Sequence, residues 1–373
     1  MKTNSWAQEE ITKITNKVKA EIGRIGTGIP YRSVTGRYYD QGASDISWWT
    51  NGFWGGLNWQ LYSVTGDALF RETAENVEVR LDQALQEFEH LHHDVGFMWL
   101  LTSVTNYRLF KQQRSFQRSI NAAVALAGRF NIDGRFLRAW NDEQTSEDCR
   151  GWVIIDSMMN VPLLFWASQE LKDPRFAKIA RKHADTVAKY LIRADGSSGH
   201  IAEFDYETGA FIRQLRGQGY GLDSAWSRGQ GWAIYGFALC YKYTGDGRYL
   251  HIAQQCANFV IPHLVVNNYL APIDFRGPAT SEDTDASASA IIACGLLELA
   301  DHVEEKGLYQ EFGRRILLKL AEIADYEENT DGILNHCAVQ YHEPSGKNSA
   351  LVYADSFYLE GLLKLTEQDI ALW

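Results

Sequence analysis

A unit of two consecutive helices recurs along the chain and limits the folds that it can adopt. In each copy an apolar, aromatic stretch leads through a short polar turn into a second segment rich in alanine and charge. Marked copies begin at Leu61, Phe165 and Leu239, and looser ones at Leu100 and Leu296. The marked turns are Gly66-Asp67, Asp173-Pro174 and Gly245-Asp246. Glycine favours the end of a helix and aspartate the start of the next, so each copy predicts a helical hairpin.

The copies follow one another without a Pro- or Ser-rich linker, which favours an all-α fold and a single domain over residues 1–373. Stacked hairpins can form an open solenoid or close into an α/α barrel of inner and outer helices. The segments that join one hairpin to the next are long and rich in Gly, Trp, His and Asp. Such loops are typical of chains that surround a shared cavity, so we expect the barrel.

Charge and cysteine usage exclude several classes of partner and site. The net charge of −11 argues against nucleic acid or an anionic membrane as the main partner, and no apolar run is long enough to span a bilayer. The N-terminal segment is polar and lacks the apolar core of a signal peptide. Five scattered cysteines without CxxC spacing predict free thiols in a reducing compartment and no zinc site. We therefore expect a cytoplasmic protein; the sequence carries no signal for an oligomeric state.

Asp156 is the most informative carboxylate, because it lies in the apolar stretch WVIIDSMMNVPLLFW. Burial of a lone carboxylate costs roughly 2–7 kcal/mol unless it is hydrogen-bonded or neutralised. A general acid that works near neutral pH needs such surroundings. The residues alone are equally compatible with a helix cap, or with a carboxylate that buried backbone donors satisfy.

Two aromatic or histidine-rich clusters precede this segment. In the first, residues 48–56, Trp49 is the candidate sugar platform, whereas Phe53 and Trp54 are expected to pack between helices. The second cluster is residues 90–97. In one interpretation His93 and Asp94 both face the cavity, and in the other Asp94 caps the following helix. A metal site is disfavoured, since adjacent residues rarely point at one ion and no HExxH-like spacing supplies further ligands.

A further cluster runs from His200 to Trp232. Arg228 lies between tryptophans and beside glycines, where a guanidinium can present two donors to a carboxylate or sulfate. Alternatively, Arg228 packs on a tryptophan at a helix start. The later stretch from Asp283 to Ala290 is interpreted as capping carboxylates that open a helix of small residues.

Several motifs in order resemble the bacterial unsaturated glucuronyl hydrolases. They are HHDVGF, GWVIIDSMMNVPLLFW, SAWSRGQGWAIYGFAL, DASASAIIACGLLEL and ADSFYLEGLLKL, between about Trp49 and about Leu365. The resemblance implies a six-hairpin α/α barrel that hydrolyses anionic oligosaccharides carrying a 4,5-unsaturated uronic acid, without a metal or an organic cofactor. It implies that Asp156 is the acid/base and Asp94 the second essential aspartate. The implied sugar contacts are Trp49, His93, Trp140, His200, Gln218, Trp226, Arg228 and Trp232.

The chain departs from the family pattern directly before Gln218. The family commonly has His-Gln-Gly there, and this chain has Gly217-Gln218-Gly219, which indicates a different leaving sugar. In the C-terminal region, where some relatives bind sulfate, the candidates are Lys347 and Ser349. The alternatives are a hydrolase of unsaturated pectin fragments, a non-catalytic carbohydrate-binding barrel, and an epimerase or phosphorylase acting on saturated sugars.

Overall fold

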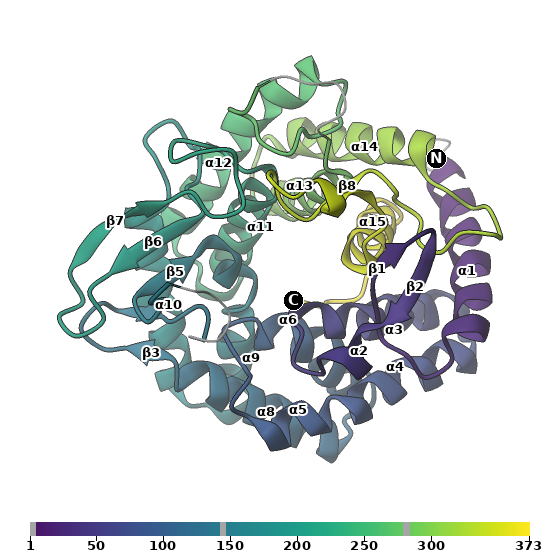
Figure 1. Cartoon of the computed structure of the whole chain (residues 1–373), viewed down its shortest axis with the longest axis horizontal. Coiled ribbons are helices and arrows are strands. Elements are labelled where there is room, and N and C mark those ends of the chain that lie inside the picture. The colour runs from purple at the N-terminus through teal and green to yellow at the C-terminus, as the bar shows by residue number, and fades with distance from the viewer. Residues whose placement is uncertain (1–4, 142–146, 279–283) are drawn as a thin grey trace.

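The computed structural model describes residues 5–141, 147–278 and 284–373. Within these residues the helices form two concentric rings (Figure 1). The inner ring contains α3 (Phe53–Thr65), α6 (Val95–Trp99) with η2 (Leu100–Val104) and α7 (Thr105–Phe110), α9 (Pro162–Leu171), α11 (Ser227–Thr244), α13 (Ala286–Ala300) and α15 (Val352–Leu365). The outer ring contains α4 (Ala68–Arg80), α8 (Gln113–Ala127), α10 (Pro174–Tyr190), α12 (Gly247–Val266), α14 (Lys306–Ile323) and α1 (Ser5–Ile25). Successive inner helices are in contact around the ring, and α15 closes it against α3. The expected α/α barrel of six hairpins is thus confirmed.

The burial of each helix follows its place in the two rings. Every residue of the inner helix α13 is buried, as expected for a helix that is apolar all round. The outer helix α10 buries one stripe only, made of Phe176, Ala180, His183, Ala184, Thr186 and Val187. Helical periodicity therefore distinguishes these two helices, since only α10 has a solvent face along its length.

The predicted turns between paired helices are present. Gly66 ends α3 with φ +68°, and Gly245 ends α11 with φ +65°. The Asp67, Asp173 and Asp246 carboxylates each accept a hydrogen bond from the backbone N–H two residues on, at the starts of α4, α10 and α12. The last pair forms differently: α15 packs against α1, so the two ends of the chain supply the sixth hairpin.

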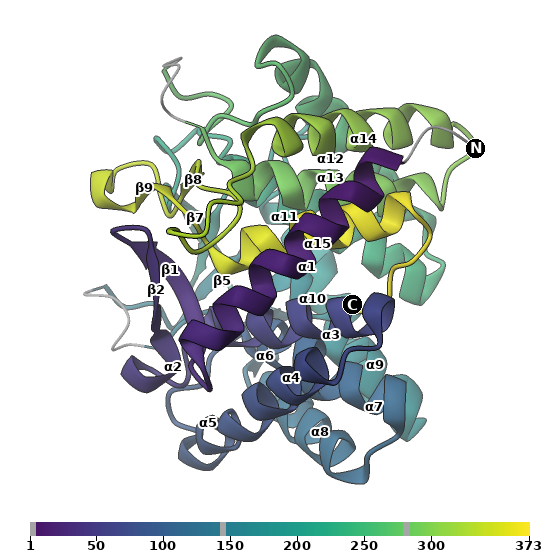
Figure 2. The ribbon, with the colours of Figure 1, turned by 90° about the vertical axis from the view of Figure 1, so that its right-hand side faces the viewer.

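Short strands and helices fill the connections between hairpins. The short helices are α2 (Gln41–Ser44), η1 (Trp49–Gly52), α5 (Asp82–Glu87), η4 (Ile155–Met159) and η5 (Pro344–Gly346). The antiparallel strands are β1 (Pro30–Val34) with β2 (Arg37–Asp40), β3 (Phe130–Asn131) with β4 (Phe136–Leu137), β5 (Trp152–Ile154) with β6 (Ile201–Phe204) and β7 (Phe211–Leu215), and β8 (Cys337–Ala338) with β9 (Lys347–Ser349). In the side view, β1, β2, β7, β8 and β9 gather at one end of the barrel and the C-terminus lies toward the other (Figure 2).

The C-terminal residues lie inside the ring at the end remote from these strands. The Trp373 ring stacks on Phe357 with centroids 5.7 Å apart, and its indole N–H donates to Glu360 at 3.0 Å. It also contacts Phe53 and Phe97. These contacts fill the barrel axis with aromatic rings, so the inner helices surround a packed core rather than a channel.

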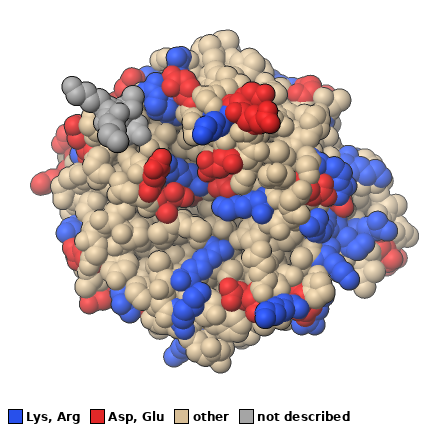
Figure 3. All heavy atoms as spheres, turned by 180° about the vertical axis from the view of Figure 1, so that it is seen from behind, with Lys and Arg blue, Asp and Glu red and all other residues tan. Residues whose placement is uncertain are grey.

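The face seen from behind carries acidic and basic side chains interspersed among uncharged ones (Figure 3). Basic side chains gather toward the right-hand edge of this view (Figure 3).

Candidate active site

A cavity of about 320 Å³ opens at the end of the barrel where the inner helices begin. It collects residues from connections that are far apart in the sequence. The lining residues are Asp45, Trp48, Trp49, His92, His93, Asp94, Trp140, Ile154, Asp156, Gln218 and Arg228. The structure therefore brings together both predicted aspartates and five of the predicted sugar contacts, namely Trp49, His93, Trp140, Gln218 and Arg228.

The starts of the inner helices face this end of the barrel. Asp94 directly precedes α6, Asp156 lies in η4 before α9, and Arg228 is the second residue of α11. The N-terminus of a helix carries unpaired N–H groups and the positive end of the helix dipole. Several such ends around one cavity favour an anionic ligand, although the chain as a whole is acidic.

Asp156 and His200 are brought together by the pairing of two short strands. β5 leads into Asp156 and pairs with β6, which follows His200, and Ile155 N–H donates to the His200 carbonyl at 3.1 Å. As a result, Asp156 Oδ1 lies 3.4 Å from His200 Nε2. Neither atom has a hydrogen-bond partner among the described residues. The alternative of a capping or backbone-satisfied carboxylate is therefore wrong, and Asp156 is left open to a ligand.

The hydrogen bond that His200 Nδ1 accepts sets the tautomer of the imidazole ring. The backbone N–H of Gln218 donates to His200 Nδ1 at 2.8 Å, so Nδ1 is the acceptor and Nε2 carries the proton. Nε2 lies 3.4 Å from Asp156 Oδ1, without the geometry of a hydrogen bond. His200 does not line the cavity itself, but it lies behind the carboxylate and orients it.

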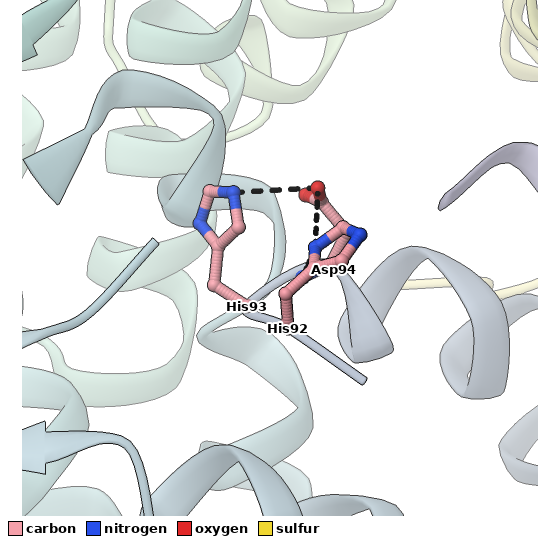
Figure 4. A group of neighbouring side chains, drawn as sticks. All are labelled: His92, His93 and Asp94. Atoms are coloured by element: carbon pink, nitrogen blue, oxygen red, sulfur yellow. Dashed lines mark hydrogen bonds and ion pairs between the residues drawn. The ribbon is translucent and has the colours of Figure 1, made fainter. Parts of the chain in front are cut away.

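Asp94 lies between two histidines and is held as a carboxylate (Figure 4). Its Oδ2 is 3.2 Å from His92 Nδ1 and 3.3 Å from His93 Nε2. Burial alone would raise the pKa of Asp94, but the charge of His93 and the hydrogen bonds from both histidines outweigh burial and hold the pKa well below its usual range. Although Asp94 stands before α6, its side chain makes no capping hydrogen bond, so the capping alternative is wrong.

Asn160 connects the two aspartates. Its Nδ2 donates to Asp94 Oδ1 at 2.9 Å and to the Asp156 carbonyl at 3.1 Å, while its Oδ1 accepts from Phe97 N–H at 2.8 Å. The approach is close enough that a Cβ on Gly96 would lie 2.4 Å from the Asn160 Cα. Asn160 thus sets the spacing of the two acids.

A metal ion could be held by only one group among the residues that the structure describes. The group is His92, His93 and Asp94, whose ligand atoms lie within 4.8 Å of one another. They are three successive residues, and both imidazoles already face the same carboxylate oxygen at hydrogen-bond distance. The geometry is that of a hydrogen-bonded carboxylate, and no step of the chemistry below requires an ion.

Arg228 is almost fully buried and is clamped from several sides. Its guanidinium donates to the Ala338 and Val339 carbonyls and to Asp285 Oδ2, the last at 3.1 Å. It also lies over the Trp226 ring, 4.5 Å from the centroid. These contacts use three of its five N–H bonds, so two remain for a ligand. Arg228 thus packs on a tryptophan, as one interpretation held, and it also lines the cavity; that it presents donors to an anionic ligand stays a prediction.

The other predicted tryptophans divide between the cavity and the core. Trp49 lines the cavity and packs against Tyr353, and Trp140 lines it and packs against Trp152. Trp226 lies behind the cavity against the His200 ring, with centroids 4.5 Å apart. Trp232 is fully buried against Phe97 and Phe357 and does not line the cavity. As expected, Phe53 and Trp54 are buried between helices.

Sequence reasoning missed four lining residues. They are Asp45, Trp48, His92 and Ile154. Trp48 and His92 adjoin predicted residues, so each signal was present but could not be assigned to a side chain. Asp45 had no signal beyond its charge. Asp285 caps α13 as expected, and in addition binds Arg228; Asp283 lies outside the described residues.

The proposed sulfate residues do not line this cavity. Lys347 and Ser349 are on β9, and neither lines the cavity. Lys347 Nζ lies over the Tyr341 ring, 5.0 Å from its centroid.

Gly217 occupies a position that only glycine fits. Its φ is +61°, and a Cβ there would lie 1.8 Å from His200 Nδ1. The family histidine could not be accommodated here without displacing His200.

We expect Gly217→Ala to lower kcat/KM by about 100-fold, because a shift of His200 of about 1 Å misplaces Asp156. Gly66→Ala is the matched control: its φ is +68°, and no atom lies within 4 Å of the added Cβ. Both substitutions should lower the free energy of unfolding by about 1 kcal/mol through backbone strain. Steady-state kinetics and urea unfolding measure the two effects, and equal activities of the two variants would contradict the role of Gly217.

A buried chain of hydrogen bonds supports Asp156 from the outer ring. Leu137 N–H donates to His183 Nδ1 at 2.9 Å, and His183 Nε2 lies 2.6 Å from the Ser157 hydroxyl. That hydroxyl donates to the Ile154 carbonyl at 2.6 Å. Burial, with a smaller contribution from His93, lowers the pKa of His183 to about 3. The ring is therefore neutral in the folded protein.

This pKa predicts acid-sensitive stability. His183 binds a proton near pH 6.5 when unfolded and near pH 3 when folded, so its contribution is complete above pH 6.5 and is lost as the pH falls. Between pH 7 and pH 4 the wild type should lose about 3 kcal/mol on this account. His183→Gln should remove that loss, whereas the exposed His251→Gln should keep it. Urea unfolding at several pH values measures the free energy of unfolding of the three proteins. If it falls equally with pH in all three, His183 is not the source of the acid sensitivity.

An α/α barrel with two aspartates at its mouth belongs to the class of barrels that process sugars by acid/base chemistry. The chain belongs to Glycosyl Hydrolase Family 88, whose model matches residues 29–360. It is 35% identical to an unsaturated glucuronyl hydrolase of Bacillus sp. (strain GL1) over 338 residues, 88% of this chain and 89% of that protein. It is 30% identical to an unsaturated chondroitin disaccharide hydrolase of Streptococcus pyogenes serotype M1, over 100% of this chain and 95% of that protein.

A solved structure shows the same fold. The crystal structure of the unsaturated glucuronyl hydrolase from Bacillus sp. GL1, responsible for the degradation of glycosaminoglycan, matches with a TM-score of 0.90. The match has 31% sequence identity and covers 96% of each chain. The chain is therefore a glycoside hydrolase of the unsaturated glucuronyl hydrolase type, and the alternative of a non-catalytic barrel is wrong.

Proposed function

We propose that the protein releases the 4,5-unsaturated uronic acid from the non-reducing end of lyase-generated, glycosaminoglycan-type oligosaccharides. The observation that carries the proposal is Asp156, which lines the cavity and whose buried Oδ1, beside His200, has no hydrogen-bond partner among the described residues. A carboxyl group that gives and takes a proton must be free of permanent hydrogen bonds on the reacting oxygen. The names of the relatives support the substrate class.

The chemistry follows from the double bond of the substrate. A 4,5-unsaturated uronide is a vinyl ether, so protonation of C4 by Asp156 produces an oxocarbenium-like centre at C5. Water attacks C5 and returns its proton to the Asp156 carboxylate, which restores the acid. The hemiketal at C5 then opens, and the resulting hemiacetal at C1 expels the leaving sugar. One water is consumed, and the rule that relates carboxylate spacing to stereochemistry at C1 does not apply.

Asp94 has a different task because it is held as the carboxylate. Its two histidines and Asn160 occupy both of its oxygens. It is therefore suited to orient a sugar hydroxyl and to favour the positive charge that develops at C5.

The uronate carboxylate needs a cationic partner, and Arg228 supplies it. The guanidinium is fixed by Asp285 and by two carbonyls, so little side-chain entropy is lost when it binds an anion. The nearby helix starts add positive potential. Trp49 and Trp140 provide apolar faces for the rings and exclude water.

The whole chain is proposed to act as one catalytic domain. A continuous hydrophobic core runs from Ala7 on α1 to Trp373 and includes the inner faces of both rings. The cavity residues are drawn from connections between residues 45 and 228. No part of the ring can be removed without opening the core on which the site rests.

Cysteine chemistry supports a reducing compartment, and we propose the cytoplasm. All five cysteines are buried and free. None of the helices in the described part of the chain is long and apolar enough to cross a membrane.

The test is turnover of unsaturated disaccharides from chondroitin, hyaluronan, heparin and pectin, followed by loss of the ultraviolet absorbance of the double bond. At least one glycosaminoglycan product should be consumed, and the same disaccharides with a saturated uronic acid should not. If only the pectin product were consumed, the substrates would be unsaturated pectin fragments and not glycosaminoglycan products. Turnover of saturated sugars would contradict the mechanism.

A further inference from the structure

Two buried carboxylates outside the cavity have no part in the chemistry above. Glu21 lies on α1 and Asp355 on α15, and their relative exposures are 1% and 2%. The two helices pack side by side where the ends of the chain form the sixth hairpin (Figure 2). Burial of an acid costs free energy unless hydrogen bonds or a proton compensate for the loss of water.

The hydrogen bonds of these two acids hold one short stretch of backbone. Gly332 N–H donates to Glu21 Oε1 at 2.7 Å. Ile333 N–H and Leu334 N–H donate to Asp355 Oδ1 at 3.1 and 3.0 Å. Two side chains from opposite ends of the chain thus fix three successive peptide groups.

This stretch leads directly to the carbonyls that clamp Arg228. Leu334 is followed by β8, and the carbonyls of Ala338 and Val339 accept from the Arg228 guanidinium. Between them, the Cys337 thiol donates to the Leu334 carbonyl at 3.1 Å, which folds the connection back on itself. The place of the guanidinium therefore depends on how the backbone before β8 is held.

We propose that Glu21 and Asp355 are positioning residues for Arg228, and that ionisation of both acids loosens the clamp and weakens binding of the substrate carboxylate. This inference rests on the proposed function, because it assumes that Arg228 binds the uronate. Neither acid lines the cavity, so both act through the backbone between residues 332 and 339.

The two acids lose their protons in the range where the enzyme is expected to work. Burial raises the pKa of Asp355 to about 7, and burial together with the charge of Asp355 raises the pKa of Glu21 to about 8. Lys17 lowers both values, but its amino group already donates to the Glu327 and Thr330 carbonyls at 2.5 and 2.9 Å. Above about pH 8, two negative charges repel each other in the core.

The other titratable groups around the pair do not relieve this repulsion. The phenol of Tyr38 on β2 and the thiol of Cys337 on β8 are buried, which raises the pKa of each, so both stay neutral. Asp331 adds a negative charge: burial opposes its ionisation, but the Tyr38 N–H and the guanidinium groups outweigh burial and lower its pKa. The guanidinium groups of Arg24 on α1 and Arg37 on β2 are both bound to Asp331.

The experiment measures the Kd of an unsaturated disaccharide by calorimetry in Asp156→Asn protein between pH 7 and pH 9. In this protein neither turnover nor the titration of Asp156 contributes. We expect Kd to rise about tenfold over this range, because the guanidinium loses its fixed position. A disaccharide whose uronate is converted to the neutral amide offers no carboxylate to Arg228, and its Kd should stay constant.

Two variants assign the effect to the acid pair. Glu21→Gln and Asp355→Asn each keep an acceptor for the backbone N–H groups and leave one carboxylate, so the repulsion cannot arise. In either variant the Kd of the unsaturated disaccharide should stay within about twofold between pH 7 and pH 9. Glu9→Gln, exposed on α1, is the matched control and should retain the tenfold rise.

Hydrogen exchange of the backbone amides gives a second measurement that needs no substrate. The protection factors of Gly332, Ile333 and Leu334 correct for the pH dependence of the exchange chemistry. They should fall about tenfold between pH 7 and pH 9 in the wild type and stay constant in Glu21→Gln and Asp355→Asn.

The results separate this inference from the proposed function. Loss of protection in the wild type alone, without any binding of the disaccharide, would support the clamp while the proposed function fails. A Kd that rises equally in both variants or for the neutral amide, or a protection that does not change with pH, would overturn the role of the two acids.

Discussion

Replacement of Asp156 by asparagine is expected to lower kcat by about 10³-fold on every unsaturated substrate. The amide cannot protonate C4 or accept the proton of the attacking water. Because the substitution is nearly isosteric and Oδ1 has no partner in the described structure, the fold should not suffer. The measurement is the loss of ultraviolet absorbance under saturating substrate, with the urea midpoint as the test of folding.

The binding of substrate distinguishes loss of chemistry from loss of the site. Calorimetry should show that Asp156→Asn binds the unsaturated disaccharide with an affinity close to KM of the wild type. The exposed Asp301→Asn, directly after α13, serves as the matched carboxylate-to-amide control and should retain full activity. Retention of more than about a tenth of the wild-type kcat in Asp156→Asn would remove this residue from the mechanism.

The largest expected effect on stability comes from Asp285→Ala. Asp285 is fully buried and combines two tasks. Its Oδ1 accepts from the N–H groups of Ser287 and Ala288 at the start of α13, and its Oδ2 accepts from Arg228. Removal of the carboxylate leaves the guanidinium buried without its counter-charge. Loss of one partner of a buried pair costs about 3–5 kcal/mol in the free energy of unfolding.

The comparison with an ordinary cap isolates the buried charge. Asp67→Ala removes the cap of α4 at a partly exposed position and should cost about 1 kcal/mol. Asp285→Asn keeps an acceptor for the cap but not the charge, so its cost should lie between the two. Urea unfolding measures all three. If Asp285→Ala costs no more than Asp67→Ala, Arg228 is stabilised by its carbonyl partners and not by the ion pair.

The architecture of the barrel was accessible from the sequence because its causes are local. Gly66 and Asp67 end one helix and begin the next through their own backbone preferences. The apolar stripe of α10 and the uniformly apolar α13 differ in periodicity. The sixth hairpin was not visible in this way, since α15 and α1 lie at opposite ends of the chain and meet only when the ring closes.

The short strands were not predicted from the sequence, although their pairing determines which side chains meet in the active site. β5 has three residues and β6 four, too few for a periodic signal in the sequence. Their pairing places His200 behind Asp156. Likewise, the family resemblance implied sugar contacts at Trp226 and Trp232, but packing places Trp232 in the core and Trp226 behind the cavity.

The hairpin repeat, the family and the two unusual acids, Asp156 and Asp94, could be recognised from the chain alone, because helix caps, periodicity and motifs depend on neighbouring residues. The difference between the two acids became visible only in the folded protein. Asp94 is fixed as a carboxylate by His92, His93 and Asn160, while Asp156 keeps a free oxygen beside His200. Protonation state and hydrogen-bond supply depend on groups that folding brings together from distant parts of the chain, so no local pattern contains them.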